Sequence, residues 1–72
     1  MAKLSDQQYL LHIGAKVREL RGAMTQKELG EKIGVHQHST IGRIERGEVN
    51  SGILLLRKIA EELGVSIEDL LP

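Results

Sequence analysis

The sequence predicts an all-α protein, a compact bundle of five helices. Apolar residues recur at three- and four-residue spacing in successive segments, which is typical of helices that bury one face. Capping residues or glycines stand at the ends of these segments, and no segment shows the sustained alternation of a half-buried strand. With 72 residues and no internal repeat, the chain has room for one domain, residues 1–72.

The first helix is expected over residues of about 6–21. Ser5 and Gln8 have the spacing of a capping box, in which each side chain bonds the backbone N–H of the other residue. Four apolar residues then follow at helical spacing: Leu10, Ile13, Val17 and Leu20. Gly22 comes directly after this segment, where we expect the left-handed conformation that ends many helices.

A second capping box, formed by Thr25 and Glu28, predicts a helix over residues of about 26–33. Leu29 and Ile33 form its apolar stripe. Gly34 follows at a point where the chain must turn sharply, and a positive φ is expected there.

The third helix is expected over residues of about 37–46, with Gly47 as its end. Its only strongly apolar residues, Ile41 and Ile44, lie three positions apart in a segment rich in hydrogen-bonding side chains. We therefore expect a narrow buried edge and an exposed polar face.

A loop over residues 48–52 precedes the last two helices. The fourth helix carries the longest apolar stripe of the chain and ends at Gly64; the stripe comprises Ile53, Leu56, Ile59, Ala60 and Leu63. Ser66 is a good N-cap for a final helix of about 67–71, whose apolar residues are Ile67, Leu70 and Leu71.

Charge and composition limit the possible functions. Ten basic and ten acidic residues give a net charge of zero, but residues 16–46 hold seven basic and four acidic groups, whereas residues 51–72 hold two and four. The chain has no cysteine, which excludes disulfides and thiolate metal sites. It shows neither a signal-peptide pattern nor an apolar run long enough to span a bilayer, so we expect a cytoplasmic protein.

Three stretches at the centre of the chain resemble the helix-turn-helix family of phage Cro and repressor proteins and related bacterial transcriptional regulators. They are Gln26 to Gly30, Gly34-Val35 and Thr40 to Gly47. The resemblance continues over Ile13 to Arg21 and Leu56 to Ser66, so it covers about residues 13–71. It implies a bundle of the phage-repressor type with a helix-turn-helix unit over about 25–46, in which Gly30 replaces the usual alanine.

The sequence departs from the family pattern in two connections. The connection between Arg21 and Thr25 looks two residues shorter than usual, and the stretch from Gly34 to Ile41 looks one residue longer. Counting back from Ile41 makes Gln37 the N-cap of the third helix and lets His36 bulge into solvent. Counting forward from Gly34 would change which of Gln37, His38 and Ser39 reaches DNA. We favour counting back from Ile41, because it keeps Ile41 and Ile44 buried.

The resemblance implies a sequence-specific DNA-binding regulator, expected to be a repressor, that inserts the third helix into the major groove. Arg43 is the first candidate for base reading, because a guanidinium can donate two parallel hydrogen bonds to guanine; His38 and Ser39 complete the base-facing set. Contacts to the sugar-phosphate backbone are expected from the residues that flank this face, Thr25, Gln26, Gln37, Thr40, Arg46, Asn50 and Ser51.

Other residues are expected to have structural or assembly roles. Arg21 and Glu45 match a family pair that forms a partly buried ion pair between the first and third helices. A homodimer is expected because one recognition helix reads only a few base pairs. Its interface is assigned to apolar residues outside the core stripes, Leu54, Leu55, Ile67 and Leu71.

The residue pattern does not favour a metal-binding protein or an enzyme. His12, His36 and His38 fit no common zinc spacing, so we expect no metal and no cofactor. An enzyme needs a nucleophile and base, or a carboxylate pair, in a cleft, and a small chain with its polar residues on a convex helix offers neither; no small-molecule substrate is expected. The remaining alternative is an antitoxin or adaptor that uses the helix-turn-helix fold mainly to bind another protein.

Overall fold

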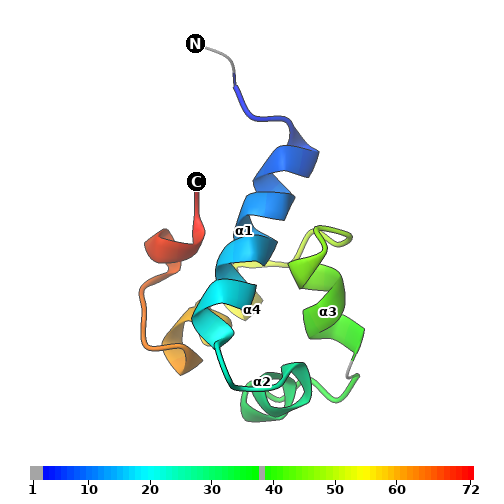
Figure 1. The fold of residues 1–72 in the computed structure, drawn as a ribbon, viewed down its shortest axis with the longest axis vertical. Helices are drawn as coiled ribbons and strands as arrows, with labels where there is room; N and C mark the ends of the chain where they lie inside the picture. Colours follow the sequence, from blue (N-terminus) through cyan, green and yellow to red (C-terminus); the bar gives the residue numbers. More distant parts are fainter. Residues whose placement is uncertain (1–2, 38) are drawn as a thin grey trace.

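The computed structural model describes residues 3–37 and 39–72, and the regular structure of both ranges is helical (Figure 1). The elements follow the predicted order: α1 (Asp6–Arg21), α2 (Gln26–Lys32), α3 (Ser39–Glu45), α4 (Ile53–Glu62) and a short 3-10 helix, η1 (Ile67–Leu70). The prediction of an all-helical bundle is confirmed. None of the described helices combines the length and apolar character needed to cross a membrane.

The expected fifth α-helix over residues 67–71 is wrong, because the described chain has four α-helices and the four-residue 3-10 helix η1. The N–H groups of Asp69 and Leu71 donate to the carbonyls of Ser66 and Glu68, at 3.0 and 3.1 Å, in the three-residue pattern of a 3-10 turn. Leu71 then adopts an extended conformation ahead of the terminal proline. Four residues are too few to build an α-helix, but they place Leu70 in the core.

The two predicted capping boxes are confirmed. The Ser5 hydroxyl accepts from the Gln8 N–H at 3.1 Å, and the Gln8 amide oxygen accepts from the Ser5 N–H at 2.8 Å. Thr25 and Glu28 form the same pair of bonds, each 3.0 Å long. These local bonds fix the starts of α1 and α2 at the expected residues.

Glycine ends α2 as expected but ends α1 in a different geometry. Gly34 has φ +79°, so the positive φ predicted after α2 is confirmed. Gly22 has φ 55° with ψ −122°, which lies outside the left-handed helical region expected for it. The chain leaves α1 through a turn in which the Met24 N–H donates to the Arg21 carbonyl at 3.0 Å, and four residues separate Arg21 from the first residue of α2, Gln26.

Each of the five elements contributes at least one fully buried side chain to the core. The largest of these are Val17, Leu29, Ile41, Ile59 and Leu70, in the order of the chain. Ile13, Ile33, Ile44, Leu56 and Ala60 complete the buried set. The core is therefore shared among all elements, and η1 is an integral part of it.

The start of α4 departs from the predicted core stripe. Ile53 was assigned to the core, but its side chain is 70% exposed. It is the first residue of α4, so the helix end projects past the elements that cover Leu56 and Ile59. Periodicity places a residue on a face but does not reveal where along the helix the covering surface stops.

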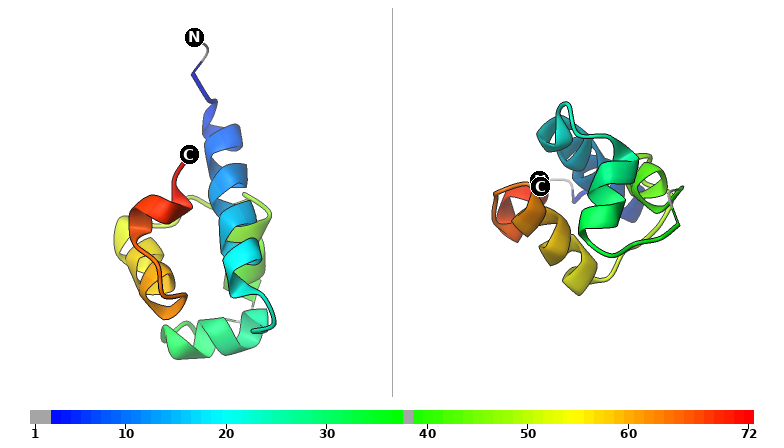
Figure 2. Two further views of the ribbon diagram at one scale, coloured as in Figure 1. Left: turned by 60° about the vertical axis from the view of Figure 1, so that its left-hand side comes forward. Right: turned by 90° about the horizontal axis from the view of Figure 1, so that it is seen from below.

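Helices α1 and α3 cross in direct backbone contact at Gly14. A Cβ atom at Gly14 would lie 2.5 Å from the carbonyl oxygens of both Ile44 and Glu45. This distance is far below van der Waals contact, so only glycine permits the crossing. Above it the N-terminal half of α1 projects from the bundle and gives the molecule its long axis of 39 Å (Figures 1 and 2).

Candidate nucleic-acid interface

Helix α3 has the narrow buried edge that the sequence predicts. Ile41, Gly42 and Ile44 are buried, whereas Ser39 and Arg43 are exposed. Thr40, between the two sets, is half-buried. The exposed side of α3 is therefore a short row of polar groups on a helix whose other side is part of the core.

The start of α3 differs from the expected residue 37, because the helix begins at Ser39. Gln37 lies ahead of the helix, and its carbonyl accepts from the Thr40 N–H at 3.0 Å. The bond spans three residues, and Gln37 itself is not helical. His38, a predicted base contact, lies outside the described residues.

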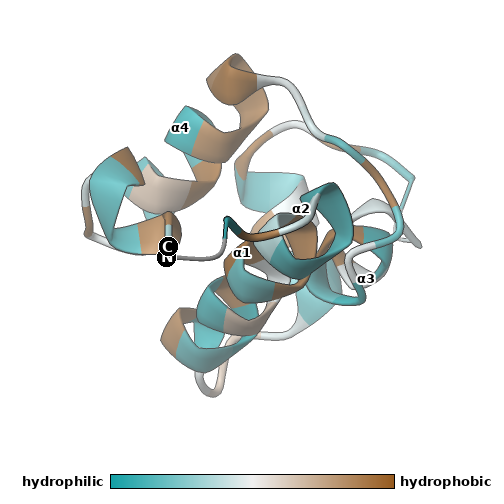
Figure 3. Ribbon diagram, turned by 90° about the horizontal axis from the view of Figure 1, so that it is seen from above, coloured by the Kyte–Doolittle hydropathy of each residue, from teal (hydrophilic) through white to brown (hydrophobic). Residues whose placement is uncertain are grey.

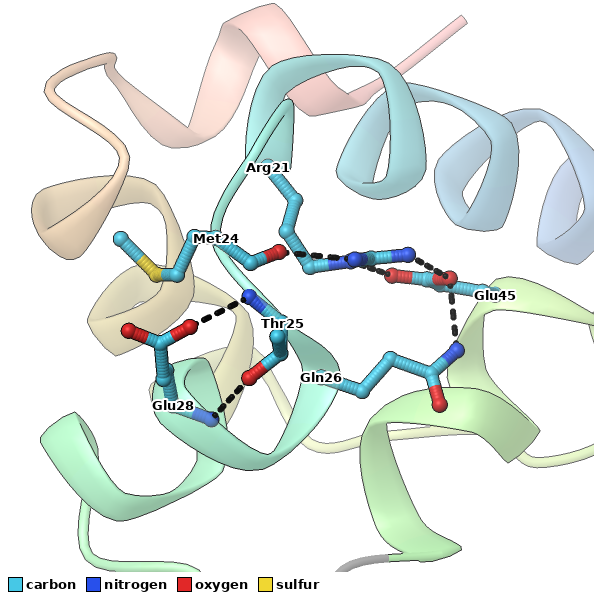
Figure 4. Close-up of polar contacts among 6 residues, drawn as sticks. All are labelled: Arg21, Met24, Thr25, Gln26, Glu28 and Glu45. Carbon is cyan, nitrogen blue, oxygen red and sulfur yellow. Dashed lines mark hydrogen bonds and ion pairs between the residues drawn. The ribbon is translucent and has the colours of Figure 1, made fainter.

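The predicted pair Arg21 and Glu45 is brought together at the C-terminal end of α3 (Figure 4). Arg21 Nε donates to Glu45 Oε2 at 2.7 Å, and Arg21 Nη2 donates to Glu45 Oε1 at 3.0 Å. The third nitrogen, Arg21 Nη1, donates to the Met24 carbonyl at 2.8 Å. The two side chains are only 16% and 4% exposed, so this bidentate pair joins α1 to α3 away from solvent.

Gln26 joins the same carboxylate, a role that sequence reasoning did not assign to it. Its Nε2 donates to Glu45 Oε1 at 3.0 Å (Figure 4). A Cβ atom at Gly42 would lie 3.2 Å from Gln26 Oε1, so the Gln26 amide crosses directly over α3. Gln26 is the first residue of α2, and the Glu45 carboxylate therefore connects α1, α2 and α3. The spacing of residues in the sequence carries no signal for this bond.

Electrostatics keep this connection ionised. Burial by itself would raise the pKa of Glu45, because a carboxylate loses hydration in the interior. Hydrogen bonds from Arg21 and Gln26, with the charges of Arg21 and Arg18, outweigh burial and lower the pKa of Glu45 below its usual value. The hydrogen bond to Glu45 likewise raises the pKa of Arg21.

The predicted backbone-contact residues have different environments. Thr25 is exposed at the start of α2, where its hydroxyl already accepts the Glu28 N–H. Arg46 is exposed, and its Nε donates to Glu48 Oε2 at 2.6 Å. Asn50 and Ser51 line a small cavity of about 20 Å³ between α1 and α4, so these two side chains partly face the protein.

The predicted dimer residues are unequally exposed. Leu54 is 64% exposed, whereas Leu55, Ile67 and Leu71 are half-buried and pack against the core. The exposed apolar surface near these residues is therefore the first turn of α4, which carries Ile53 and Leu54.

The described fold and the order of its elements correspond to a known family. The family model described as helix-turn-helix matches residues 15–70, which include all of α2, α3, α4 and η1. The chain belongs to this family of helix-turn-helix DNA-binding regulators. The first fourteen residues of the sequence precede the matched region.

Relatives and solved structures agree with this membership. An uncharacterized HTH-type transcriptional regulator from Archaeoglobus fulgidus is 42% identical over 57 residues, which cover 76% of this chain and 80% of the relative. The restriction-modification controller protein C.AhdI from Aeromonas hydrophila has a TM-score of 0.80 at 30% identity, over 86% of this chain and 96% of that one. The transcription factor NHTF from Neisseria, described as hypothetical, has a TM-score of 0.84 at 25% identity, over 100% and 85%. The names of all three describe regulatory proteins.

Proposed function

We propose that this helix-turn-helix protein is a sequence-specific transcriptional repressor that binds DNA as a homodimer, with α3 in the major groove. The observation that carries the proposal is the division of α3 into a buried edge and an exposed polar row, on a helix fixed by the Arg21–Glu45 pair. A major groove is wide enough to admit a helix with such a face. The resemblance to phage repressors favours repression.

Base reading is assigned to the exposed row. The Arg43 guanidinium can donate two parallel hydrogen bonds to O6 and N7 of guanine, the commonest specific contact in the major groove. Ser39, one helical turn before Arg43, can donate or accept a hydrogen bond. His38 belongs to this set from the sequence alone.

Backbone contacts are assigned to the residues around α3. Thr25 and Gln26 stand at the start of α2, and the second amide hydrogen of Gln26 can reach a phosphate while the first bonds Glu45. Arg46 would exchange Glu48 for a phosphate oxygen. The other residues proposed here are Gln37, Thr40, Asn50 and Ser51.

We propose a dimer because one copy would have too little affinity for DNA. One recognition helix reads few base pairs, and a protein with a net charge of zero gains little from counterion release. A second half-site, read by a second copy, supplies the missing contacts. We assign the interface to Leu54, with support from the half-buried Leu55, Ile67 and Leu71. The half-sites should then form an inverted repeat about 34–36 Å apart.

Selection of bound duplexes from a random DNA pool tests the proposal. We expect an enriched inverted repeat that the purified protein shifts in a gel at moderate salt, and that lowers expression of a reporter when placed in its promoter. Absence of any enriched sequence would refute sequence-specific binding. Co-purification with another protein, without a DNA shift, would instead support an antitoxin or adaptor.

A further inference from the structure

The projecting half of α1 borders a groove that no residue of α3 lines, although Asn50, one of the proposed backbone contacts, belongs to its lining. This open groove of about 350 Å³ is lined by Asp6, Tyr9 and Leu10 of α1 and by Asn50 of the loop before α4. Tyr9 is 41% exposed, and Leu10 is half-buried. Exposed aromatic surface beside a groove is typical of a protein interface.

The first turn of α4, with Ile53 and Leu54, is called the α4 tip here, and it follows the groove residue Asn50 in the chain. Ile53 and Leu54, three and four residues beyond Asn50, are 70% and 64% exposed, the highest values among the large apolar side chains described. Figure 3 shows the first turn of α4 as a brown end at the edge of the molecule. The tip and the groove are therefore joined by a short stretch of chain, Ser51 and Gly52.

The polar groups of the tip and the groove are complementary. The N-cap of α4 is Gly52, which has no side chain to accept the free N–H groups of the first turn, and this turn contains no acidic residue. A helix N-terminus carries a partial positive charge. Asp6 supplies a carboxylate at the groove, and a carboxylate is the group that such a terminus lacks.

We propose that the α4 tip of a second copy of this chain occupies the groove, with the partner's Leu54 between Tyr9 and Leu10 and with Asp6 facing the first-turn N–H groups of the partner's α4. The inference rests on the homodimer proposed above and names the surfaces that meet in it. In a two-fold dimer each copy would place its tip in the groove of the other, so the same pair of surfaces would form both halves of the contact. The exchange covers both exposed apolar surfaces at once.

Cysteine cross-linking tests the contact, because the chain has no cysteine of its own. Tyr9→Cys and a longer, tagged Leu54→Cys protein are co-expressed, purified together and oxidised. We expect a disulfide-linked species that contains both chains and forms roughly tenfold or more faster than chance encounters allow, since contacting residues have a high effective concentration. The matched control replaces Tyr9→Cys with Ala15→Cys, another exposed position on α1, and should form this species only at the rate of chance encounter.

The other outcomes overturn the inference in distinguishable ways. Cross-linking no faster than the Ala15→Cys control, with a dimer still present by sedimentation, would exclude the groove as the contact and leave the proposed DNA-binding dimer in place. A monomer both free and on its selected site would exclude the dimer as well. Sequence-specific binding in the selection experiment would then still stand, because that result does not depend on the interface.

Discussion

Glu45 is the residue on which the placement of α3 most depends. Its two carboxylate oxygens accept three hydrogen bonds, two from Arg21 and one from Gln26, and its side chain is 4% exposed. Removing one partner of a buried pair costs more than the pair itself contributes, because the other charge is left unpaired. Loss of Arg21 or Glu45 would therefore remove a connection between α1 and α3 and leave a buried charge behind.

Replacing Glu45 with alanine should lower the free energy of unfolding by about 3–5 kcal/mol, because Arg21 would be left charged and largely buried. Thermal melting and urea denaturation measure the change. The matched control is Glu48→Ala, which removes the solvent-exposed partner of Arg46 and should leave the melting temperature close to that of the wild type. Equal shifts in the two variants would contradict a special role for the Arg21–Glu45 pair.

The contribution of Glu45 should depend on pH. The pKa of Glu45 is lower in the folded protein than in the unfolded chain, so its stabilisation is complete above the unfolded pKa, about 4.3, and is lost as the pH falls through the folded pKa. Glu45→Gln keeps the shape but cannot ionise. The difference in unfolding free energy between wild type and this variant should be large at pH 7 and should shrink at acidic pH, in urea titrations at both. A constant difference would refute the linkage.

Arg43 is expected to determine base preference. Arg43→Ala should cost about 1–3 kcal/mol on the best site and relax specificity at one base pair per half-site. The comparison variant is Arg46→Ala, proposed as a phosphate contact, which should weaken binding to selected and scrambled duplexes alike. If Arg43→Ala binds the two duplexes in the wild-type ratio, Arg43 does not read bases.

At the scale of elements, the crossing of α1 and α3 leaves no room for a Cβ atom at Gly14. Gly14→Ala should destabilise the protein by about 1–3 kcal/mol or more, although alanine favours a helix by about 1 kcal/mol, because the new methyl group meets rigid backbone oxygens at 2.5 Å. Gly30→Ala is the matched control. There the nearest atom, the Val35 carbonyl oxygen, lies at 3.3 Å, and the variant should melt near the wild type. An unchanged melting temperature for Gly14→Ala would contradict the crossing.

The elements that the sequence predicts well are those determined locally. The starts of α1 and α2 follow from capping boxes whose bonds span three residues, and the buried edge of α3 follows from the spacing of Ile41 and Ile44. Where the neighbouring elements stop covering α4 depends on residues far away in the sequence. Periodicity therefore predicts Ile53 in the apolar stripe, although its side chain is 70% exposed. The bond from Gln26 to Glu45 joins residues 19 positions apart and depends on how α2 and α3 meet.

At the scale of the whole molecule, assembly should depend on the tip of α4. Leu54→Lys should produce a monomer by sedimentation and weaken binding to the inverted repeat, since a charged side chain would replace the most exposed of the leucines predicted for the interface. Leu55 is less suitable for this test because it also packs against the core. Ala15→Lys adds the same charge on an exposed position of α1 and should remain dimeric. A dimeric Leu54→Lys protein would contradict the assigned interface.

The shared core also has a consequence for biosynthesis. Val17 of α1 and Leu70 of η1 are both fully buried, and α1 and η1 are in contact although they lie near opposite ends of the chain. The bundle therefore cannot complete its core during synthesis until η1 has been made, because η1 follows all the other elements in the chain. Until Leu70 leaves the exit tunnel, the nascent chain keeps part of its apolar surface open to water, and a chain truncated before η1 should be a substrate for proteases.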